Sequence, residues 1–115
     1  SDTLTAFGAY SGLEAGGAYN TFMGVSAGAR TGGQNVAVGY FSLTGTNNAS
    51  NTVAIGFETG RFSTGSGNIF IGHQAGKNAQ GSNNLYIHIS VSHTYFYCSL
   101  FCFKILFVCN SEISI

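Results

Sequence analysis

The sequence predicts an all-β protein: a β-solenoid of about five coils of 15–17 residues each, followed by an apolar tail that does not belong to the repeat. One glycine-centred motif recurs at a nearly constant interval, which is the signature of a repeat architecture. Apolar residues alternate within each copy, as in short strands. The 115 residues include 17 glycines and no proline, which fits a fold of short strands and many turns.

Each copy is anchored by a glycine that follows a large apolar residue. In chain order these pairs are Phe7-Gly8, Met23-Gly24, Val38-Gly39, Ile55-Gly56 and Ile71-Gly72. Successive anchors are 16, 15, 17 and 16 residues apart. Helical repeats need about 33 residues or more, so this period is too short for them.

A small side chain lies three residues after each anchor, and a second glycine usually follows it. The small residues are Ser11, Ala27, Ser42, Thr59 and Ala75, and the second glycines are Gly12, Gly28, Gly60 and Gly76. The third copy has Leu43 in place of this glycine. Small residues at fixed positions predict a narrow interior, because only they let opposed walls approach closely.

The residues that lead into each anchor alternate between apolar and other types, as at Val36 and Val38, or Ile69 and Ile71. This alternation predicts a short strand with one buried face. Gly, Asn, Ser and Thr cluster between the copies and supply turn positions. We therefore expect two strands and two turns per coil, with coils about 4.8 Å apart.

The large residues before the anchors are expected to form an inner ladder. The residues one position earlier would then face outward, since side chains alternate along a strand. These are Ala6, Phe22, Ala37, Ala54 and Phe70. An uncharged apolar outer column suggests contact with another chain, although scattered apolar surface residues are also common.

Few residues carry charge: they make up 7% of the chain, and the formal net charge is zero. The four cations Arg30, Arg61, Lys77 and Lys104 are isolated in the sequence, so no basic patch for nucleic acid is expected. Low charge favours burial within an assembly. No charged region followed by an apolar run marks a signal peptide, and we interpret the chain as part of a longer polypeptide.

Composition divides the chain into a repeat domain, 1–87, and an apolar tail, 88–115, that contains neither glycine nor alanine. Three interpretations of the tail remain open. In the first, the tail is foreign to the fold and comes from a frameshift, an unspliced intron or a gene-model end, since its residues are those of A/T-rich codons. Alternatively, it is a membrane segment, although the 16 residues 94–109 fall short of the roughly 20 that span a bilayer. The third interpretation is a cap on the open end of the solenoid.

No metal, cofactor or catalytic residue is expected. Cys98, Cys102 and Cys109, with His88 and His93, match no ordinary zinc spacing, and their odd number indicates no disulfide framework.

Within the repeat, Glu14 and Glu58 occupy non-equivalent positions, which disfavours a glycosidase pair at about 5–10 Å. His73 follows an anchor where other copies have Ala9, Val25, Tyr40 or Phe57, so it is interpreted as one member of a stacked column.

An enzyme alternative comes from Ile71–Gly76, which also fits the hexapeptide of left-handed β-helix acyltransferases. Such a repeat places an apolar residue every six positions. The positions six after the ladder residues are Leu13, Ala29, Thr44, Arg61 and Lys77. Two are charged, so the second hexad fails, and the acyltransferase-like fragment remains the alternative to a structural function.

The motif Asn51-Thr52-Val53-Ala54-Ile55-Gly56 resembles the head repeat of trimeric autotransporter adhesins of the YadA type. The stretch 68–76, followed by 81–84, resembles the similar repeats of phage and virus tail fibres. The resemblance covers about residues 3–87. It implies a left-handed parallel β-roll in a homotrimer, part of a fibre on a cell surface or virion that binds a host-cell receptor or matrix. The repeat is longer and less uniform than in the adhesins, and Leu43 and Phe62 interrupt its small positions.

We therefore expect a non-enzymatic structural module that self-associates and attaches to a host. Its candidate contact residues lie in or beside turns: Tyr10, Tyr19, Arg30, Arg61 and Lys77. Contact with a membrane is expected only if the tail is a genuine segment.

Overall fold

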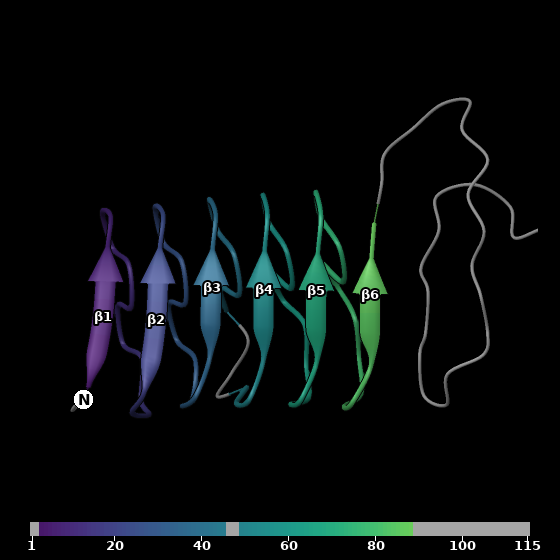
Figure 1. Cartoon of the computed structure of the whole chain (residues 1–115), viewed down its shortest axis with the longest axis horizontal. Coiled ribbons are helices and arrows are strands. Elements are labelled where there is room, and N and C mark those ends of the chain that lie inside the picture. The colour runs from purple at the N-terminus through teal and green to yellow at the C-terminus, as the bar shows by residue number, and fades with distance from the viewer. Residues whose placement is uncertain (1–2, 46–48, 89–115) are drawn as a thin grey trace, which may run out of the picture.

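A computed structural model describes residues 3–45 and 49–88. They form a solenoid of about five turns whose strands lie side by side in chain order (Figure 1). The strands are β1 (Leu4–Phe7), β2 (Asn20–Met23), β3 (Val36–Val38), β4 (Val53–Ile55), β5 (Ile69–Ile71) and β6 (Leu85–Ile87). Every neighbouring pair is parallel, and the described residues contain no helix. The predicted all-β solenoid is confirmed.

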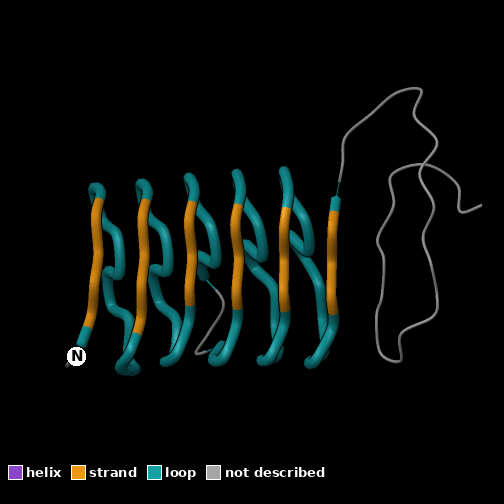
Figure 2. Tube along the Cα trace, in the orientation of Figure 1, coloured by secondary structure: helices purple, strands orange, loops and turns teal. Residues whose placement is uncertain are grey.

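The strand register matches the alignment of the anchors. Phe7 pairs with Met23, Met23 with Val38, Val38 with Ile55 and Ile55 with Ile71. Each coil has one strand, however, and not the two that we expected. Turns form the opposite wall (Figure 2). Backbone hydrogen bonds still join the coils there, for example from Gly12 N to Ala27 O at 2.8 Å.

The anchor glycines are required because the backbone changes direction where neighbouring coils touch. Their φ angles run from 107° to 132°, a region that L side chains rarely adopt. A Cβ atom on Gly24 would lie 2.6 Å from the carbonyl oxygen of Gly39 in the next coil. Any larger residue at an anchor would therefore push two coils apart.

The expected orientation of the strands is wrong: from the second coil on, the interior is lined by the residues two before the anchors, whereas Ala6 in the first coil is exposed. Phe22 and Phe70 are 1% and 0% exposed, whereas Phe7 and Met23, from the expected inner ladder, are 75% and 54% exposed. Ala37 and Ala54 are also buried, and Val38, Ile55 and Ile71 point outward with Phe7 and Met23. Alternation established that the strand has two faces, but it could not identify the inner one.

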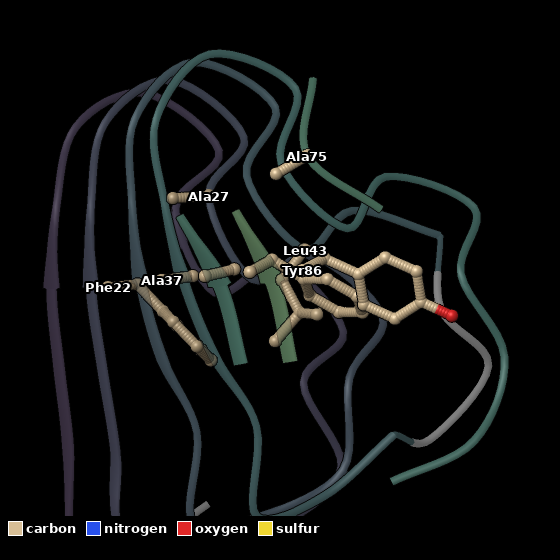
Figure 3. Close-up of a cluster of buried hydrophobic side chains, with 8 residues drawn as sticks. Phe22, Ala27, Ala37, Leu43, Ala75 and Tyr86 are labelled. Carbon is tan, nitrogen blue, oxygen red and sulfur yellow. The ribbon is translucent and has the colours of Figure 1, made fainter. Parts of the chain in front are cut away.

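Complementary side-chain sizes across the solenoid explain this orientation. A Cβ on Gly28 would lie 2.3 Å from the ring of Phe22, and one on Gly76 would lie 2.1 Å from the ring of Phe70. The coil of Ala37 instead places Leu43, which is fully buried, in the second-glycine position (Figure 3). A large residue from one wall thus meets a small one from the other, as close packing requires.

A buried asparagine ladder, not expected from the sequence, ties the coils together beside this core. The side-chain oxygen of Asn20 accepts a hydrogen bond from the backbone N–H of Asn35, and Asn35 does the same for Thr52, both at 2.9 Å. Asn68 repeats the contact with Asn84. The fourth-coil member of this column is thus Thr52, and its neighbour Asn51 is exposed.

A serine ladder runs along the turn that precedes the strands. The hydroxyl oxygens of Ser50, Ser66 and Ser82 accept hydrogen bonds from the backbone N–H groups of Gly33, Ser50 and Ser66 at 2.9–3.1 Å. Both ladders satisfy backbone donors at the turn, where strand pairing stops.

The residues before the position of a sixth anchor form strand β6, although that position is occupied by His88 and not by glycine. The His88 N–H donates to Ile71 O at 3.0 Å, and the sheet therefore continues to this residue. The division at residue 87, and all interpretations of the tail beyond His88, concern residues outside the described ranges.

Candidate interaction surface

The outward side chains of the six strands form one continuous apolar surface, the outer face. It consists of Thr5, Phe7, Thr21, Met23, Val36, Val38, Val53, Ile55, Ile69, Ile71, Leu85 and Ile87. None of these side chains is charged. Val36, Ile55, Ile69 and Ile71 are 37–42% exposed within the single chain. Parallel sheets occur almost only where both faces are covered, so this face has the character of an interface.

A column of rings continues this surface around the anchor corner. The rings of Tyr40 and Phe57 stack at 5.4 Å with 7° between their planes, and Phe57 and His73 stack at 5.1 Å and 6°. The interpretation of His73 as one member of a stacked column is confirmed. Since the rings cover one another's faces, they present mainly their edges to the surroundings.

The charged side chains among the described residues lie two to six positions after an anchor, away from the outer face. Glu58 is nearly buried and is the centre of one cluster. Its Oε1 accepts from Gln74 Nε2 at 2.9 Å and from Lys77 Nζ at 3.2 Å, and its Oε2 pairs with Arg61. The hydrogen bond from Gln74, helped by Arg61 and Lys77 and opposed by desolvation, lowers the pKa of Glu58 to about 2.

This cluster includes two of the five candidate contact residues. The guanidinium of Arg61 pairs with Glu58 and lies 4.0 Å from the ring centroid of Phe41, and Lys77 is held by the same carboxylate. Both cations thus have an acidic partner within the chain, and their role in contacting a receptor stays a prediction.

The other three candidates project from the solenoid. Tyr10 and Tyr19 are each 68% exposed, and Arg30 makes only an exposed pair with Glu14 at 3.1 Å. Their role in contacting a receptor stays a prediction. Each glutamate thus pairs with nearby cations: Glu14 with Arg30, and Glu58 with Arg61 and Lys77.

The described residues also bear on other kinds of site. They contain no group of three or more His, Cys, Asp or Glu side chains placed to hold a metal ion. Within the same ranges, no helix has the length and apolar character needed to cross a membrane. A hollow of about 270 Å³ at the last coil is lined by residues 74–79 with Tyr86 and His88. It lies at the end of the described part of the solenoid.

Comparison of the chain with protein-family models, with curated proteins and with solved structures gave no match in any of the three. The β-solenoid fold is shown by the structure itself. The resemblance to adhesin heads and tail fibres remains a prediction from the repeat motif.

Proposed function

We propose that this chain is a non-enzymatic structural segment of a homotrimeric fibre on a cell surface or virion, and that the fibre attaches to host cells or matrix. In this proposal the outer faces of three copies pack against one another. The corner residues remain outside and meet the receptor.

The observation that carries the proposal is the uncharged, apolar outer face of the six-stranded sheet. Burying apolar surface contributes about 25 cal/mol per Å², and no charged side chain on this face opposes its burial. The charged side chains that the structure describes lie instead at corners that three packed sheets would leave in water. This distribution is the one expected of a surface buried between chains.

A load-carrying role is supported by the bonds that run along the axis. Strand pairing, the backbone bonds of the turn wall and the two side-chain ladders all join one coil to the next. Deforming the solenoid along its axis would break several of these bonds in each coil. The solenoid should therefore behave as a stiff rod.

The proposal is tested by the mass of the chain in solution. Sedimentation equilibrium of the full chain should give three copies. Ile55→Lys/Ile71→Lys, which puts charges on the outer face, should give a single copy with its β-sheet circular dichroism retained. Thr64→Lys is the matched control, because Thr64 is exposed in a turn away from the face. A single-copy wild-type chain at micromolar concentration would refute the assembly.

Attachment needs a separate measurement. Fluorescent wild-type protein should bind host cells or matrix proteins, and Tyr10→Ala/Tyr19→Ala should reduce this binding without changing the mass in solution. Equal binding by the variant would remove the two tyrosines as contact residues.

A further inference from the structure

We draw no further inference here: the strongest candidate, the outer edge of the sheet at β1, where the N–H groups of Gly8 and Tyr10 match those that join each later coil to the coil before it, offers backbone donors for an added strand, but nothing in the structure shows what covers it.

Discussion

At the scale of single residues, large side chains from one wall of the solenoid pack against small residues of the opposite wall. Phe70 faces Gly76, and in the third coil Ala37 is accompanied by Leu43. Leu43, which interrupts the glycine column, fills the space beside the small Ala37, whereas the fourth coil has both Ala54 and Gly60 and is filled by Phe70 and Leu43 from its neighbours. This relation indicates which strand face is inside more reliably than alternation does, because only inward side chains need to compensate one another.

The first prediction is that Gly76→Ala strongly destabilises the solenoid. The added Cβ would lie 2.1 Å from the ring of Phe70, at a φ of 61°. Overpacking typically costs about 1–3 kcal/mol, and the positive φ adds about 1 kcal/mol. Urea unfolding followed by circular dichroism measures the change.

Gly45→Ala is the matched control for this substitution. Its φ is 75°, but the new Cβ would lie 3.4 Å from Phe62, an ordinary contact. It should therefore incur the backbone cost alone, about 1 kcal/mol. Phe70→Ala/Gly76→Leu, which copies the third coil, should recover part of the loss. Equal destabilisation by the two alanines would show that side-chain volume is not what selects glycine.

The second prediction concerns the asparagine ladder. Asn35 is fully buried, accepts from Thr52 N at 2.9 Å and donates to Ala49 O at 2.8 Å. Asn35→Leu should cost about 1–3 kcal/mol of unfolding free energy, because it leaves the buried N–H of Thr52 without an acceptor, whereas Ala49 O keeps its bond from Gly32 N at 2.9 Å. Asn51→Asp, at the exposed neighbouring position, should change stability by no more than about 0.5 kcal/mol, because aspartate tolerates the φ of 56° there much as asparagine does. The difference between their urea midpoints measures the ladder contribution.

At the scale of the elements, the sequence predicted the register and the coil length but not the number of strands or the inner face. The anchors can be recognised in the sequence because each has a φ between 107° and 132° and no room for a Cβ, so glycine is strongly favoured there. The wall opposite the strands has the same backbone bonds between coils as a sheet would, but residues such as Gln74 and Glu58 with positive φ break its extended path. The local sequence does not directly predict such turns.

The sequence predicted an uncharged apolar column on the outer side of the strands, and the structure has one. That this column meets another chain stays a prediction. The column contains Ile55 and Ile71, however, and not Phe22 and Phe70. The Glu58 cluster could not be read from the sequence, since its members come from different turns of adjacent coils.

The third prediction is that the Glu58 cluster stabilises the contact between the fourth and fifth coils, and that this stabilisation depends on pH. The folded pKa of about 2 lies below the ordinary value of 4.5, so the ionised carboxylate favours the folded state. This contribution should be fully present above about pH 5 and be lost as the pH falls toward 2. Glu58→Gln should therefore lower the melting temperature at pH 7 more than at pH 2.5.

Glu14→Gln is the control for Glu58→Gln, because both side chains of the pair between Glu14 and Arg30 are exposed to water. Its effect at pH 7 should be small. A melting temperature of Glu58→Gln that falls by the same amount at both pH values would assign the loss to packing and not to charge.

At the scale of the whole molecule, the repeat should be stable without the apolar tail. All the strand pairs, both ladders and the core described above lie between residues 4 and 87. The sixth strand is held at its end by the backbone hydrogen bond from His88 N to Ile71 O. A solenoid gains its stability from contacts between neighbouring coils, and the contacts named above involve only residues that the truncation keeps. The chain cut after His88 should therefore keep its β-sheet circular dichroism and unfold at the same urea concentration as the full chain. A fall in the urea midpoint would identify residues 89–115 as a cap, because exposure of the last described coil, with Tyr86 at its end, is what such a cap would prevent.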